Sequence, residues 1–149
     1  MKDVDETLSE AVDKILEIAR ETLLQHGSHL PTVILHTLQG TCPMVLPFKD
    51  AEQKKAMLEF VKKTAVEKNA YAVTTVTCAR IVDSRTGEEE ESLVVTTAVQ
   101  GGGSDAVVQS FIRDAERHVI AFGDAISGDH AAMPGQLTIF PPWEDEIPH

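Results

Sequence analysis

The sequence has few cysteines and no long apolar run, and each of these shortages excludes a class of protein. Cys42 and Cys78 are the only two cysteines in 149 residues. Each falls in a strand-like run, which favours reduced thiols over a disulfide framework. No apolar run approaches the roughly 20 residues that a membrane-spanning helix needs. The first residues also lack the basic and apolar regions of a secretory signal, so we expect a cytoplasmic protein.

Basic residues are scarce as well. Lys and Arg number 13 against 24 Asp and Glu, which gives a net charge of −11. A surface of this charge repels nucleic-acid phosphates and anionic lipid. The densest basic groups are only Lys54-Lys55 and Lys62-Lys63, on one predicted helix. We therefore expect no direct nucleic-acid partner and no membrane partner.

What is present is an ordinary globular composition, with 42% hydrophobic and 25% charged residues. Apolar residues recur at helical spacing in two segments and alternate or run together in six others. Gly, Pro and Asn punctuate these segments. The predicted helices are Asp5–Gln25 and Asp50 to about Asn69; the predicted strands are Thr32–Gln39, Cys42–Leu46, Ala70–Val82, Ser92–Val99, Ala106–Arg113 and His118–Gly123.

The order α-β-β-α-β-β-β-β predicts an α+β fold, with two helices on one face of a mostly antiparallel sheet of five to six strands. Gln109–Phe122 also fits a helix, and that alternative stays open. We expect residues 1–123 to form a single domain. Gly and Pro recur in 124–149, which predicts a loop and C-terminal tail packed on the domain or on a dimer mate. Apolar residues on both faces of Ala70–Val82 favour a homodimer.

The strand Glu91-Ser92-Leu93-Val94-Val95-Thr96-Thr97 and the hairpin that follows it resemble a small family of uncharacterised prokaryotic α+β proteins. The resemblance covers most of the chain and includes the order of the helices and strands. It implies the same α+β fold. No activity is assigned to that family, so the resemblance implies no functional residue for this chain.

Histidines raise the question of a metal site. His26 and His29 flank Gly27-Ser28 just after the first predicted helix and are the candidate ligands. Metal sites usually need three or four convergent ligands. His36 lies on a strand face beside aliphatic residues, where a structural histidine is more common. We therefore expect no bound metal, and no sequence pattern indicates a cofactor.

The pattern that comes nearest to a catalytic cluster follows Gly123. Asp124, Asp129 and His130 bring two carboxylates and an imidazole into one predicted loop, together with Ser127. The same residue types also form turns, because their side chains hydrogen-bond to the local backbone. A small hydrolase that uses this loop, or the corner formed by His26 and His29, is the alternative hypothesis for function.

Two further segments are candidates for binding. Glu88 and Glu89 belong to a glutamate run at a hairpin tip, which is typical of a solvated turn and is a candidate docking patch for a basic partner. Phe140 and Trp143 lie among prolines and acids, and such segments dock on proteins. The leading hypothesis is a non-catalytic binding or assembly protein with an acidic surface, and the sequence favours this over an enzyme.

Overall fold

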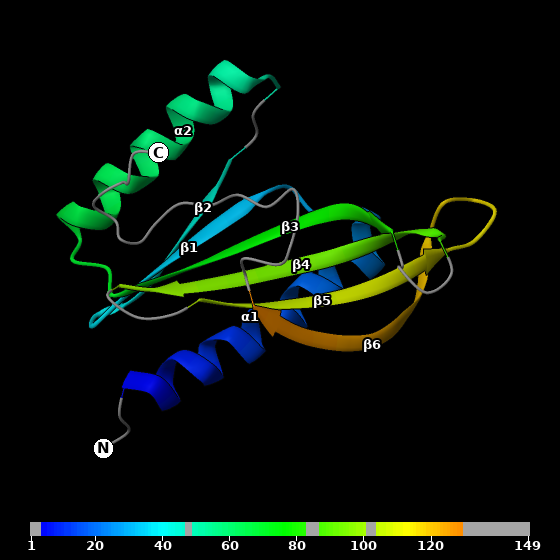
Figure 1. Cartoon of the computed structure of the whole chain (residues 1–149), viewed down its shortest axis with the longest axis horizontal. Coiled ribbons are helices and arrows are strands. Elements are labelled where there is room, and N and C mark those ends of the chain that lie inside the picture. Colours follow the sequence, from blue (N-terminus) through cyan, green and yellow to red (C-terminus); the bar gives the residue numbers. More distant parts are fainter. Residues whose placement is uncertain (1–3, 47–48, 83–86, 101–103, 130–149) are drawn as a thin grey trace.

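The structure, a computed structural model, describes residues 4–46, 49–82, 87–100 and 104–129 (Figure 1). These residues form two helices and six strands in the predicted order, which confirms the α+β class. Neither of the two helices combines the length and the apolar character that a membrane span requires. The elements are α1 (Val4–His26), β1 (Thr32–Thr37), β2 (Gly40–Val45), α2 (Ala51–Glu67), β3 (Ala72–Val82), β4 (Glu89–Val99), β5 (Ser104–Arg113) and β6 (Val119–Asp129).

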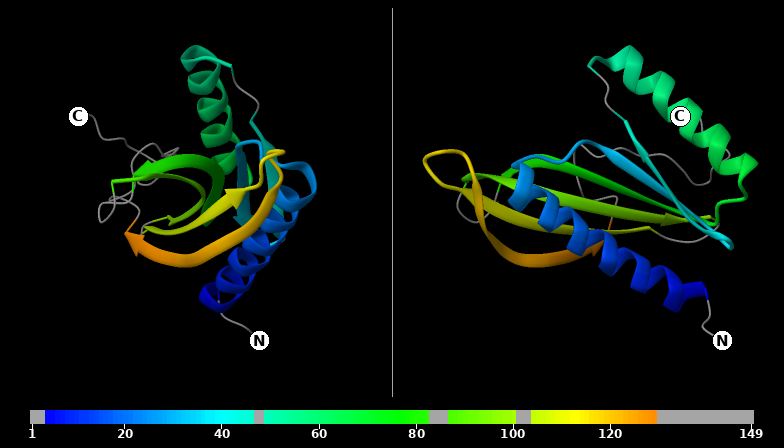
Figure 2. Two further views of the ribbon diagram at one scale, coloured as in Figure 1. Left: turned by 90° about the vertical axis from the view of Figure 1, so that its right-hand side faces the viewer. Right: turned by 180° about the vertical axis from the view of Figure 1, so that it is seen from behind.

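All six strands belong to one antiparallel sheet, in the order β2-β1-β3-β4-β5-β6. β1 lies between β2 and β3, so α2 connects two strands that are not neighbours. β2 and β6 form the edges. Pro43 lies in the edge strand β2, and an edge strand is where proline is expected because it cannot donate a ladder hydrogen bond. The sheet is strongly curved, as the end-on view in Figure 2 shows.

The two helices pack on opposite faces of the sheet, whereas the sequence predicted both on one face. Successive side chains of a strand point to opposite faces. On β1, Ile34 belongs to the core beneath α1, while Val33 and Leu35 belong to the core beneath α2. On β3, Val76 and Val73 divide in the same way. The structure corrects the one-face arrangement, because both faces of these strands carry buried apolar side chains.

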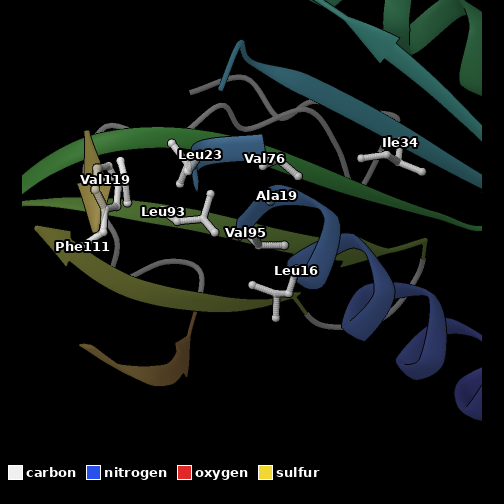
Figure 3. Close-up of a cluster of buried hydrophobic side chains, with 9 residues drawn as sticks. All are labelled: Leu16, Ala19, Leu23, Ile34, Val76, Leu93, Val95, Phe111 and Val119. Carbon is white, nitrogen blue, oxygen red and sulfur yellow. The ribbon is translucent and has the colours of Figure 1, made fainter. Parts of the chain in front are cut away.

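α1 packs on its face of the sheet through its C-terminal half. Leu16, Ala19 and Leu23 recur at helical spacing and are buried. Figure 3 shows these side chains directed at β3 and β4. The helix ends where Gly27 adopts a φ of 77° and its N–H donates to the Leu23 carbonyl at 2.8 Å.

α2 covers the opposite face at the β1–β2 end of the sheet (Figure 1). Asp50 caps the helix, because its side chain accepts a hydrogen bond from the Gln53 N–H at 2.8 Å. Val61 and Ala65 are buried in the core that α2 shares with β1 and β3. Phe60 of the same helix is 60% exposed, because it points to a different side of the helix from Val61.

β6 is longer than predicted. The predicted strand over His118–Gly123 is present, and the helical alternative for Gln109–Phe122 is wrong. The residues from Asp124 were predicted to form a loop, but they continue β6 and pair with β5 as far as Asp129. Tertiary pairing here overrides a local sequence that favours turns. The predicted C-terminal tail, 130–149, lies outside the described residues.

Polar contacts join α1, β4, β5 and β6 at the end of the sheet near the helix C-terminus. Arg113 Nε donates to Glu91 Oε2 at 2.7 Å. Gln109 Nε2 donates to the Gly123 carbonyl at 2.8 Å, and Gln109 Oε1 accepts from Arg20 of α1 at 3.2 Å. The Arg20–Gln109 hydrogen bond and the apolar core hold the C-terminal half of α1 against the sheet, and the other two contacts join neighbouring strands.

Candidate functional site

A cavity of about 690 Å³ lies between the N-terminal half of α1 and the sheet. The helix crosses β4 and β5 at an angle, as the view from behind in Figure 2 shows. The buried α1 residues of the core cluster begin at Leu16, and the helix residues that line the cavity all come before it. The lining residues are Leu8, Ser9, Val12 and Asp13 of α1, Val95, Thr97 and Val99 of β4, Asp105, Ala106 and Val107 of β5, and Ser127 of β6.

The cavity has an apolar interior and a polar mouth. Leu8, Val95 and Thr97 are buried, with side chains no more than 9% exposed. Asp13 and Asp105, which line the same cavity, are exposed. The volume falls in the range of about 300–1,000 Å³ that is usual for small-molecule clefts.

Strand register places a row of residues across the cavity face of the sheet. Thr74 of β3 lies opposite Thr97 of β4, and Thr97 lies opposite Asp105 of β5. Asp105 in turn pairs in register with Asp129 of β6. Ile34 of β1 begins the row and belongs to the core beneath α1, which fixes the face that the row occupies. Directly opposed residues share a face, and Thr97 and Asp105 of this row line the cavity.

A buried histidine contacts Thr74, the residue of this row on β3. His36 Nε2 lies 2.7 Å from Thr74 Oγ1, and Thr74 Oγ1 lies 3.1 Å from Thr97 Oγ1. The His36 side chain is 1% exposed, and burial lowers its pKa to about 4. The Tyr71 ring lies beside it, with 6.3 Å between ring centroids. A neutral imidazole therefore orients a threonine hydroxyl in the cavity wall through one intervening hydroxyl.

The contacts from His36 through Thr74 to Thr97 suit ligand binding better than acid–base catalysis. A general base works best with a pKa near the operating pH, and His36 is neutral well below pH 7. Cys78 is no better suited as a nucleophile. The residue is exposed overall, but its thiol loses hydration on the sheet, and this raises its pKa to about 11. The thiol therefore stays protonated at neutral pH.

Two other hollows have walls formed mostly by exposed residues. One, of about 540 Å³, lies between the β1–β2 turn and the end of α2. The other, of about 390 Å³, lies at the C-terminus of α1 and includes His26, Arg117 and His118. All three of these side chains are exposed.

The histidine corner does not form a metal centre in the part of the chain that the structure describes. His26 lines the hollow at the end of α1. His29 Nδ1 instead lies 2.8 Å from the carbonyl oxygen of Leu30. Among the described residues, no three His, Cys, Asp or Glu side chains gather closely enough to hold a metal ion.

The remaining predicted site residues are separated. Asp124 and Asp129 both lie in β6, and five strand residues place them about 16 Å apart. Glu88 and Glu89 are exposed, and Glu89 pairs with Arg80 across the β3–β4 hairpin at 3.3 Å. His130, Phe140 and Trp143, which completed the predicted catalytic and binding sets, lie outside the described residues.

Comparison with known proteins adds no family to this description. No protein-family model matches the chain, no curated protein matches it, and no solved structure matches it. The resemblance to an uncharacterised prokaryotic family therefore stays a prediction. Function has to be inferred from the site itself.

Sequence reasoning missed the cavity residues Asp13, Thr97 and Asp105. A weak signal was available, because Thr96 and Thr97 interrupt the apolar residues of β4 and an aspartate follows the first residue of β5. Their convergence depends on strand register and on the angle of α1, and neither can be read from spacing along the chain.

Proposed function

We propose that the protein is a non-catalytic binding protein and that it takes a small molecule in the cavity between α1 and β4–β6. The observation that carries the proposal is the cavity itself, which is large enough for a ligand, apolar inside and polar at its mouth. Concave sites of this kind, with a few convergent polar groups, are the usual sites of ligand binding. The net charge of −11 supports an acidic surface for the protein as a whole.

The lining chemistry supports binding over catalysis. The described residues that line the cavity are aliphatic residues, serines, a threonine and two aspartates. Serine and threonine hydroxyls need an adjacent base to become nucleophiles, and His36 contacts Thr97 only through Thr74. The hydrolase alternative has less support, because Asp124 and Asp129 are separated along β6.

The cytoplasmic location and the homodimer belong to the same proposal. A dimer is supported by Ile126 of β6, which is 60% exposed. It lies opposite Val108 and, through it, Val94, on the sheet face away from α1. Changing Ile126 to lysine should shift a dimer toward monomer in size-exclusion chromatography with light scattering. A single monomeric species in the unaltered protein would remove the dimer from the proposal.

Small-molecule binding can be tested with an uncharged fluorophore. Nile red should show saturable fluorescence enhancement with the full-length protein, because the cavity interior is apolar. Val99→Trp should abolish that signal by filling the cavity from β4. Val45→Trp is the matched control, because Val45 is 54% exposed on the edge strand β2 and makes no part of the cavity lining.

Circular dichroism and urea denaturation would show that both variants keep the fold. Saturable binding that is lost in Val99→Trp and kept in Val45→Trp supports the cavity as the site. No saturable binding in the unaltered protein, or equal binding in a folded Val99→Trp variant, would contradict the proposal.

A further inference from the structure

We propose that the ligand of the α1–sheet cavity is a small organic amine, bound with its apolar body inside and its ammonium group at the mouth. This inference rests on the proposed function and adds the chemical class of the ligand. The cavity defines the site, and the charges at its mouth decide which kind of ligand it favours.

The interior selects an apolar body. Leu8 and Val95 are buried at the cavity wall, and Val12, Val99 and Val107 are partly buried there. Each methylene that leaves water for such a surface contributes about 0.8 kcal/mol. A short alkyl or aryl chain therefore gains binding free energy by entering the cavity.

The mouth selects a positive charge. Asp13 of α1 and Asp105 of β5 line the cavity from opposite walls. Among the described residues, neither aspartate has an ion-pair partner. The described lining residues include no lysine, arginine or histidine. The electrostatic potential at the mouth is therefore negative, and complementarity favours a cation over a neutral or anionic ligand.

Hydroxyl groups provide the acceptors that an ammonium group needs. An ammonium group has three N–H donors and no acceptor. Ser9 and Ser127 are exposed at the cavity, and Thr97 lines its wall. Together with the two carboxylates they offer only acceptors or rotatable hydroxyls, so no fixed donor opposes the ligand. A carboxylate ligand would meet the opposite situation, with two negative charges facing its own.

The net charge of the protein also favours a cationic ligand. At −11, the protein attracts small cations from a distance and repels small anions. This long-range attraction is screened by salt, with a Debye length of about 8 Å at physiological ionic strength. The preference for an amine should therefore weaken, and remain measurable, when salt is raised.

The test compares three ligands of equal chain length. Octylammonium, 1-octanol and octanoate, each below its critical micelle concentration, are titrated against the full-length protein with Nile red displacement as the readout. We expect octylammonium to bind about two- to fivefold tighter than 1-octanol, the size that exposed charge pairs give, and octanoate to bind most weakly. The order should be the same in isothermal titration calorimetry.

Charge-removing variants locate the effect. Asp13→Asn with Asp105→Asn should bring the octylammonium affinity close to that of 1-octanol and leave 1-octanol binding unchanged, because both changes keep the side-chain shape. Asp124→Asn is the control for loss of a negative charge, because Asp124 is an exposed carboxylate of β6 that does not line the cavity. If the double variant folds poorly, the single variant Asp13→Asn is tested instead, and it should reduce the preference for octylammonium over 1-octanol.

Each outcome decides between the two proposals. A preference for octylammonium that is lost in the Asp13 and Asp105 variants and kept in Asp124→Asn supports the inference. Equal binding of octylammonium and 1-octanol, or an amine preference that survives both substitutions, overturns the inference and leaves the proposed function standing. Failure of Nile red and of all three ligands to bind contradicts the proposed function itself.

Discussion

His36 Nε2 lies 2.7 Å from Thr74 Oγ1, and His36 is only 1% exposed to solvent. Burial disfavours the charged imidazolium and lowers the pKa of His36 from 6.5 to about 4. The folded protein therefore holds a neutral imidazole next to a hydroxyl that leads to Thr97 in the cavity wall. Protonation of His36 would cost folding free energy and disturb this chain of contacts.

The first prediction concerns stability in mild acid. The folded pKa of His36 is lower than its unfolded value, so the unfolded state binds more protons between pH 6.5 and about 4. Stability should fall as the pH is lowered through that window. The difference between the two pKa values corresponds to about 3 kcal/mol.

Replacing His36 with glutamine isolates this contribution. The unfolding free energies of the two proteins, measured by urea denaturation from pH 7 to pH 4, should converge as the pH falls, because only the unaltered protein has this titrating group. The glutamine variant keeps all the carboxylates of the unaltered protein. The pH dependence that they cause therefore appears in both proteins and cancels in the comparison. Parallel pH profiles would show that His36 is not the residue responsible.

The elements of the fold were predictable from local patterns, and His36 was expected to be a structural histidine. The placement of the two helices was not predicted. β1 carries buried apolar residues at consecutive positions, Val33, Ile34 and Leu35, so alternation gives no single buried face. The same mixture in β3 was interpreted as a surface for a tail or a second copy. In the structure α2 covers part of that second face.

The candidate site was less predictable than the fold, for a physical reason. Asp105 faces Thr97 only because β4 and β5 pair in one register, and a shift of one residue would move it to the other face. Asp13 joins them because α1 crosses the sheet at an angle that no local pattern encodes. By contrast, Asp124 and Asp129 are close in sequence but are separated once β6 extends through them.

The second prediction compares two glutamates that pair with arginines. Arg113 Nε donates to Glu91 at 2.7 Å, and both side chains are mostly shielded from solvent. That hydrogen bond holds the pKa of Glu91 below its ordinary value. Glu91→Gln should therefore lower the unfolding free energy at pH 7 by about 1.5–3 kcal/mol, the usual contribution of a hydrogen bond to a charged group.

Glu89→Gln is the matched control, because Glu89 forms an exposed pair with Arg80 at 3.3 Å. Such a pair contributes about 0–1 kcal/mol. The contribution of Glu91 is present above the unfolded pKa of the carboxyl and is lost as the pH falls through the lower folded pKa. The unaltered protein and Glu91→Gln should therefore converge in acid. Equal effects of the two substitutions at pH 7 would contradict the burial argument.

The third prediction concerns the close approach of β5 and β6 at Gly123. A Cβ atom added at Gly123 would lie 2.6 Å from Ser110 Oγ, which is too close for any real contact. The strand register shifts nearby, between Gln109 and Phe111, and Gln109 Nε2 donates to the Gly123 carbonyl at 2.8 Å. The neighbouring backbone is therefore held in place, and the strain has to be relieved by the serine side chain.

Gly123→Ala should lower the free energy of unfolding by about 1 kcal/mol, which appears as a lower urea midpoint with an unchanged slope. This is the low end of the cost of overpacking, because the Ser110 hydroxyl can rotate. Ser110→Ala removes the atom that clashes and leaves its Cβ at 4.0 Å, an ordinary contact distance. Combining the two substitutions should therefore recover most of the loss caused by Gly123→Ala. Strictly additive effects in this double-mutant cycle would show that the two residues do not meet as the structure places them. A positive coupling would confirm the close approach of β5 and β6 at this shift in strand register.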